Sequence, residues 1–137
     1  MISRLALSLL LLSMPAQLLQ GRIQSYPEVI AASVPFYPGL AWSLKMSGIV
    51  EIALSINKGV VVDAKVVSAP SAFLSSATLT NVKTWKFRTK ERKSFSVKYV
   101  YTIEGEPTDI PQTPKIELDL PSVVKVTARP FKPTTSD

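Results

Sequence analysis

The amino-acid sequence predicts a small α+β domain with two layers, in which helices cover one face of a three-stranded antiparallel sheet. Three segments alternate apolar and polar residues with the period of two that is typical of half-buried strands. Two shorter segments carry apolar residues at helical spacing, and the order along the chain is αββαβ. Because the sheet and the helices must each bury an apolar face, packing the helices on one side of the sheet gives a two-layer domain.

The first two strands form a hairpin. The first runs from Ile49 to Ile56, and every even-numbered residue in it is a large aliphatic one. The second runs from Val60 to Ser68 and alternates in a similar way. Between them, Asn57-Lys58-Gly59 supplies residues that tolerate a positive φ, which a tight hairpin turn requires.

Two helices flank this hairpin in the sequence. The first is expected to make two turns from Leu40 to Met46, with Leu40 and Leu44 on one apolar face. The second is expected from Ala72 to Thr84. Ser71 is its expected N-cap, because a serine hydroxyl can accept a hydrogen bond from an unpaired N–H of the first helical turn.

The third strand is expected from Ser94 to Ile103, at the edge of the predicted sheet. Trp85 and Phe87 precede it and are expected in the core, since each has a large apolar area to bury. An edge strand leaves N–H and C=O groups unpaired, and another strand can dock on them. This edge is therefore the first candidate interaction site.

The N-terminal segment predicts export. Arg4 is followed by a mostly apolar run from Leu5 to Met14 and then by Pro15-Ala16, which is the pattern of a secretory signal peptide. A membrane-spanning helix needs about 20 apolar residues, and this run is shorter. We expect residues 1–21 to be a signal peptide, with a short uncleaved anchor as the alternative, and residues 22–33 to be a linker.

Composition excludes several kinds of catalysis. The 137 residues include no cysteine and no histidine, which removes disulfides, thiol nucleophiles, imidazole bases and the usual zinc sites. The five glycines are not clustered, so the sequence has no glycine-rich phosphate loop. We therefore expect a binding or structural protein and not an enzyme, with no cofactor and no metal.

Several short motifs, in this order, resemble the C-terminal domain of the TonB family of periplasmic proteins. They lie between Val34 and Thr102, and they imply the αββαβ fold for residues 34–105 and a periplasmic location. The motifs are Pro35-Phe36-Tyr37-Pro38, Gly48-Ile49-Val50-Glu51-Ile52, Ile56-Asn57-Lys58-Gly59-Val60-Val61, Asp63-Ala64-Lys65-Val66-Val67, Leu74 with Ala77, and Val82-Lys83-Thr84-Trp85-Lys86-Phe87.

The resemblance implies a protein-interaction domain that takes part in TonB-dependent transport across the outer membrane. Such a domain binds an extended peptide, the TonB box of a transporter, by strand addition to its edge strand. The N-terminal segment has no histidine and the linker is short, unlike in the family's energy transducers, so we do not expect this chain to transduce energy alone. The contact residues implied are Tyr37, Pro38, Phe95, Val97, Tyr99 and Tyr101.

The C-terminal residues 106–137 suggest an alternative function. Six of the eleven prolines lie between residues 107 and 133, so we expect an extended Pro-rich tail on the domain surface. Within it, Val123 to Ala128 is similar to a TonB box, which is typically a short apolar β run ending near Thr-Ala. This segment could add an extra strand to its own domain or to a second copy. The alternative is thus a structural or accessory envelope protein whose sheet edge is capped by its own tail or by a second copy.

Positive charge is concentrated in one part of the chain. There are 16 Lys+Arg against 10 Asp+Glu, a formal charge of +6. A basic cluster suits an acidic protein segment or an anionic envelope surface, or is simply a solvated loop. The partners expected are a peptide of a transporter, a second copy in a homodimer or an anionic surface, and not nucleic acid. The candidate basic patch is Lys86, Arg88, Lys90, Arg92 and Lys93.

Overall fold

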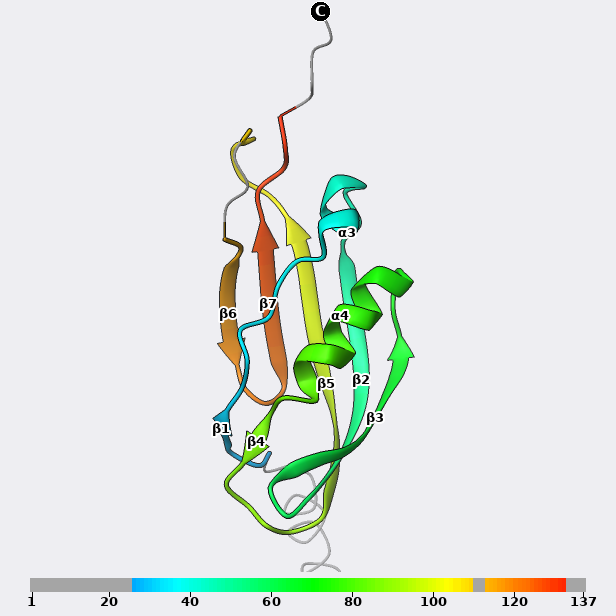
Figure 1. Ribbon diagram of the computed structural model, residues 1–137, viewed down its shortest axis with the longest axis vertical. Coiled ribbons are helices and arrows are strands. Elements are labelled where there is room, and N and C mark those ends of the chain that lie inside the picture. Colours follow the sequence, from blue (N-terminus) through cyan, green and yellow to red (C-terminus); the bar gives the residue numbers. More distant parts are fainter. Residues whose placement is uncertain (1–25, 110–112, 133–137) are drawn as a thin grey trace, which may run out of the picture.

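The computed structural model describes residues 26–109 and 113–132. Long strands run side by side along the length of the molecule, with the helices in front of them (Figure 1). The predicted signal peptide lies outside the described residues. The elements in chain order are β1 (Val29–Ala31), α3 (Gly39–Ser43), β2 (Gly48–Asn57), β3 (Val60–Ser68), α4 (Ala72–Val82), β4 (Lys86–Phe87), β5 (Lys93–Ile103), β6 (Lys115–Asp119) and β7 (Val123–Ala128).

The described strands form one seven-stranded mixed sheet in the order β1-β4-β3-β2-β5-β7-β6. Every neighbouring pair is antiparallel except β5 and β7, which run parallel. The predicted three-stranded antiparallel sheet is therefore wrong, and the described chain is mostly β with two short helices. The reason is that segments before the first helix and after the third strand join the same sheet. Short alternating runs next to prolines do not reveal in the sequence that they pair.

The centre of the sheet confirms the predicted strands. β2 pairs with β3 on one side and with β5 on the other, over nearly their whole lengths. Lys58 and Gly59 in the hairpin turn have φ of 54° and 81°. A Cβ on Gly59 would lie 2.8 Å from the carbonyl oxygen of Phe87, so this position requires glycine both for its backbone conformation and for space.

The second helix begins where the sequence predicts. The Ser71 hydroxyl accepts a hydrogen bond from the N–H of Leu74 at 3.2 Å, which satisfies one of the unpaired donors of the first turn. Among the residues that the structure describes, no helix is both long enough and apolar enough to cross a membrane.

The first helix differs from its prediction. It is only five residues long, and Leu40 and Leu44 are each 60% exposed. Ala41 and Trp42 are buried instead. The i, i+4 leucine spacing was misleading because Trp42 has more apolar area to bury, and its burial turns the leucines toward solvent.

The core lies on the face of the sheet that carries the helices. In front of β7 and β6 that face is crossed by the segment between β1 and α3 (Figure 1). The core draws on the long strands β2 and β5 and includes the C-terminal strand β7, whereas the long strand β3 has no fully buried residue. Fully buried strand residues are Val50, Ile52, Leu54 and Ile56 of β2, Phe87 of β4, Val97, Tyr99 and Tyr101 of β5, and Val124, Val126 and Ala128 of β7.

Candidate functional site

The candidate contact residues on β5 face the core. Val97, Tyr99 and Tyr101 are fully buried, and Phe95 is half-buried. Phe95 also packs edge-on against Phe87, with ring centroids 5.7 Å apart. A partner could therefore meet this part of β5 only through its backbone.

The backbone edge of β5 is occupied by the chain's own C-terminal strand. β7 pairs with β5 over six residue pairs, from Lys98 with Val123 to Ile103 with Ala128. At the two ends of this ladder the N–H of Lys98 donates to the carbonyl of Ser122, and the N–H of Glu104 donates to that of Ala128, each at 2.9 Å. The position at which a transporter peptide would add to the predicted edge is thus filled in cis.

An aromatic clamp holds the chain that follows β7, and sequence reasoning did not find it. The Trp42 ring stacks on Phe131, with centroids 4.8 Å apart and an interplanar angle of 25°. Its indole Nε1–H donates to the carbonyl of Arg129 at 2.7 Å. Thr108 is buried and exchanges backbone hydrogen bonds with the same stretch. No signal in the sequence connects positions so far apart.

Three tyrosine hydroxyls lie in the core and are satisfied by hydrogen bonds. The Tyr99 hydroxyl donates to Oδ1 of Asn81 at 2.6 Å, and the hydroxyls of Tyr101 and Thr78 are 2.8 Å apart. The Tyr37 hydroxyl donates to the carbonyl of Met46. These bonds fix α4 and the entry to β2 on the sheet, since a buried hydroxyl without a partner is costly.

Burial makes these tyrosines harder to ionise. Loss of solvation and, to a smaller extent, the neighbouring Tyr101 raise the pKa of Tyr37 to about 12. Burial likewise raises the pKa of Tyr101 to about 12, although its hydrogen bond to Thr78 opposes the shift. The pKa of Tyr99 is raised more strongly, again mainly by burial. All three are therefore neutral structural groups at physiological pH.

Tyr37 and Pro38 position the first helix. Pro38 is its N-cap, with φ −59° and ψ 133°, and its carbonyl accepts a hydrogen bond from the N–H of Trp42 at 2.9 Å. The Tyr37 ring packs edge-on against Tyr101, with centroids 5.4 Å apart. Of the pair, Tyr37 is buried and Pro38 is half-buried, so only the proline offers surface to a partner.

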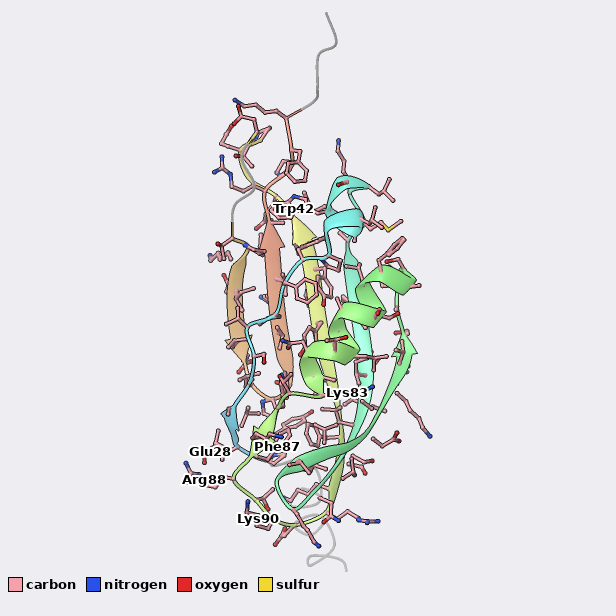
Figure 2. All side chains as sticks on the ribbon, viewed as in Figure 1. Glu28, Trp42, Lys83, Phe87, Arg88 and Lys90 are labelled. Atoms are coloured by element: carbon pink, nitrogen blue, oxygen red, sulfur yellow. The ribbon has the colours of Figure 1, made fainter. Side chains whose placement is uncertain are left out.

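The candidate basic patch lies at one end of the molecule. Lys86, Arg88, Lys90 and Arg92 are exposed, and Lys93 is half-buried. Figure 2 places Arg88 and Lys90 at the end of the molecule opposite Trp42.

The β2–β3 turn adds a cation to this patch that the sequence reasoning left out. The N–H of Lys58 donates to the carbonyl of Lys90 at 3.1 Å, which brings the turn against the loop before β5. Lys58 is exposed there. The turn motif predicts the hairpin, but it does not predict that Lys58 lies beside the basic patch.

Arg88 is the patch residue with an acidic partner in the described chain. Its guanidinium donates to Glu28 through Nε at 2.8 Å and through a terminal nitrogen at 3.3 Å. This hydrogen bond and the attraction between the charges lower the pKa of Glu28 and raise that of Arg88. The pair fastens the start of the described chain to the loop after β4, so the neighbouring lysines and Arg92 carry the net charge of the patch.

A pocket of about 210 Å³ opens where the N-terminal segment crosses β6 and β7. It is mainly apolar. It is lined by Ala32, Ser33, Val34 and Pro35 of the N-terminal segment, by Ile116, Leu118, Leu120 and Val124 of the region from β6 to β7, and by Asn81 and Trp85. Val34 is 74% exposed and Leu118 54% exposed, so the rim of this pocket presents apolar surface to solvent.

The two carboxylates of the β2–β3 hairpin, Glu51 and Asp63, do not lie opposite one another. Asp63 lies opposite Ser55 in the hairpin register and forms a 3.8 Å salt bridge with Lys65, whereas Glu51 lies opposite Ser68. No cluster of three or more Asp, Glu, His or Cys residues in the described chain could hold a metal ion.

No protein-family model matches the chain, and no curated protein matches it either. The resemblance to the TonB family stays a prediction that rests on the motifs quoted above.

Proposed function

We propose that this chain is an exported accessory protein of the cell envelope, without catalytic activity, whose β5 edge is capped by its own strand β7. The observation that carries the proposal is the six-residue pairing of β7 with β5. Val124, Val126 and Ala128 are fully buried, so the cap is part of the core and not a loosely attached tail. The protein then acts through its remaining surfaces.

Strand addition at β5 by a transporter peptide is the less supported function. It would require β7 to leave, and with it six residue pairs and three fully buried side chains. Such a displacement exposes apolar area that stabilises the fold at roughly 25 cal/mol per Å². A short peptide would have to replace all of these interactions before it gained any affinity.

A peptide titration separates the two functions. The full chain, labelled with ¹⁵N, is titrated with a synthetic TonB-box-like peptide and followed by NMR. The expected result is that amide signals from Lys93 to Ile103 do not shift. Shifts that saturate along this strand, together with loss of the β7 signals, would show that a peptide displaces the cap and would overturn the proposal.

Envelope location has its own test. Cell fractionation, followed by sequencing of the mature N-terminus, is expected to find the protein in the periplasm with residues up to about position 16–21 removed. Retention of Met1 in the membrane fraction would instead support the anchored alternative.

We expect the protein to bind an anionic surface with the end of the molecule that carries the basic patch. Binding to vesicles of anionic lipid should exceed binding to neutral vesicles and should fall as salt is raised, because exposed charges are screened over about 10 Å at 0.1 M salt. Replacing Lys90 and Arg92 by glutamate should abolish the difference. Binding that is equal for both lipids would assign the patch to a solvated loop.

A further inference from the structure

In the part of the chain that the structure describes, no strand pairs with the outer side of β6. Within residues 26–109 and 113–132, β6 pairs only with β7 and ends the sheet. Folded proteins usually cover such an edge, bend it or place charges on it, because its unpaired N–H and C=O groups can pair with another strand. β6 does carry three charged residues, Lys115, Glu117 and Asp119.

The five residues of β6 divide cleanly between the two faces of the sheet. Ile116 and Leu118 lie opposite the buried Val126 and Val124 of β7, and therefore on the face that carries the core. Lys115, Glu117 and Asp119 lie on the other face and are exposed. The strand thus reads cation, apolar, anion, apolar, anion.

Antiparallel pairing of β6 with a second β6 brings opposite charges together. Two residues that lie directly opposite one another on neighbouring strands point to the same face of the sheet. The allowed registers are therefore those that set core-facing residues opposite core-facing residues. When Glu117 lies on the two-fold axis, Lys115 of each copy is opposite Asp119 of the other. Ile116 of each copy is then opposite Leu118 of the other.

We propose that β6 pairs antiparallel with β6 of a second copy about a two-fold axis at Glu117, which joins the two sheets into one. The interface is isologous, as closed dimers require. It contains two Lys–Asp pairs and two Ile–Leu pairs. This proposal goes beyond the accessory role and does not depend on it.

Neighbouring registers fit less well. A shift that places Leu118 on the axis sets Glu117 opposite Asp119 twice, and like charges directly opposite are destabilising. A shift that places Ile116 on the axis sets Leu118 opposite Pro114, which has no N–H to donate to a ladder. The register at Glu117 uses all five residues of the strand.

The two glutamates that meet at the axis have cations around them. Glu117 forms a 2.9 Å salt bridge with Lys115 of its own chain, and both this bond and the nearby Lys125 lower its pKa. Lys125 is also directly opposite Glu117 in the β6–β7 register. The central repulsion is therefore offset by a lysine on β6 and another on β7 in each copy.

The apolar face of the same edge also benefits from a second copy. Leu118 and Val34 line one pocket and are both largely exposed. In the dimer, Leu118 of the partner copy lies next to Ile116 and extends the apolar surface beside this pocket. The pairing thus covers apolar area that is exposed to water in the single chain.

Charge reversal tests this pairing with the full chain. Lys115→Asp sets two carboxylates opposite one another at each outer pair, and Asp119→Lys sets two ammonium groups there. Each variant alone is expected to weaken dimerisation about tenfold or more, measured by analytical ultracentrifugation. A one-to-one mixture of the two variants restores opposite charges at both pairs, so it should form a heterodimer with nearly the original affinity.

Rescue by mixing distinguishes pairing from a general loss of stability. Circular dichroism should show that both variants keep the fold, since the altered side chains are exposed. If the unaltered chain is monomeric at all accessible concentrations, or if the mixture dimerises no better than the variants alone, the proposal is wrong.

A cysteine cross-link tests the axis directly, because the chain has no cysteine of its own. Glu117→Cys places one thiol of each copy at the axis, where directly opposed Cα atoms are about 4.5–5.5 Å apart and within disulfide range. Mild oxidation should convert most of this variant to a covalent dimer. The matched control is Ser96→Cys, an exposed position on the central strand β5. Equal cross-linking of the two variants would overturn the assigned register.

Discussion

The two halves of the sheet are covered in different ways. The half made of β3 and β2 contacts the helix α4, which contributes Leu74 and Val82 to the core and also bonds to Tyr99 and Tyr101 of β5. The half made of β7 and β6 is covered by the extended segment 32–35, and a pocket remains between them. A helix fills the surface of a sheet with side chains from several turns, whereas a single extended segment covers only a narrow band. One sheet can therefore carry a closed core over one half and a partly open core over the other.

The largest effect is expected when the half of the sheet made of β7 and β6 is removed. A chain ending at Pro107 lacks β6, β7 and the Phe131 side of the aromatic clamp. We expect it to lose cooperative unfolding, because Val124, Val126 and Ala128 are part of the core. Near-ultraviolet circular dichroism during thermal unfolding measures this.

The matched control is a chain ending at Lys132, which keeps every described contact of the tail. It should unfold like the full chain. If the chain ending at Pro107 also unfolds cooperatively at the same midpoint, the tail half is not part of the core.

Substitution of one buried valine in each half of the sheet measures how tightly each half is packed. Val97 lies on β5 and Val124 on β7, and neither is exposed to solvent. Alanine at either position should lower the free energy of unfolding by about 2 kcal/mol, since each change removes buried methyl groups from a packed site. Urea unfolding of both variants gives the two values. If Val124→Ala lowers the free energy of unfolding far less than Val97→Ala does, then the half of the sheet next to the pocket rearranges to fill the space left by the removed methyl groups.

Alkaline pH tests the junction between the halves, where Tyr101 on β5 lies opposite Val126 on β7. The pKa of Tyr101 is raised to about 12 in the folded chain, against about 10 when unfolded. The folded state therefore keeps a proton that the unfolded state releases. Its stabilising effect is complete below pH 10 and is lost as pH rises toward 12, by at most about 1.4 kcal/mol per pH unit.

Tyr37 contributes in the same direction, because its pKa is raised to about 12 as well. Urea unfolding at a series of pH values from neutral to alkaline measures the slope. In Tyr101→Phe the slope should be smaller. An unfolding free energy that does not change above pH 10 would contradict the buried, neutral state of these tyrosines.

The smallest expected effect concerns the clamp. Trp42→Phe keeps a ring to stack on Phe131 but removes the hydrogen bond from Nε1 to Arg129. We expect a loss of about 1 kcal/mol, the usual net value of one such bond. Tyr26→Phe, at an exposed ring, is the control and should cost nearly nothing. If the two variants are equally stable, the indole hydrogen bond contributes nothing to holding the tail.

Local pattern was sufficient to predict the centre of the fold. The hairpin alternation, the turn at Gly59 and the cap at Ser71 are short-range features, and all three are present. Of the strands added to this centre, the sequence offered only the one from Val123 to Ala128, as a possible extra strand, and the structure has it as β7. β1 and β4 have three and two residues, too few for a period, and prolines around β6 and β7 favoured an extended tail over a sheet.

The candidate site shows the same division. The sequence placed Phe95, Val97, Tyr99 and Tyr101 correctly on one face of one strand, and the buried face is the one with the helices. The sequence offered its own segment from Val123 to Ala128, or a second copy of the chain, as the neighbour of that strand, but it could not tell which of the two would lie there. Pairing between β5 and β7 depends on contacts between residues more than twenty positions apart, and such contacts leave no local signature.

The place of β7 between β5 and β6 bears on the order in which the domain can form. β7 follows every other strand in the sequence, and domains emerge N-terminal end first as they are made. The β2–β3 hairpin can form early from local contacts, but β5 has no neighbour on one side until residues 123–128 are available. During that interval its edge is open to other strands, and a chaperone that shields such edges would have its greatest effect on this protein before residues 123–128 have been made.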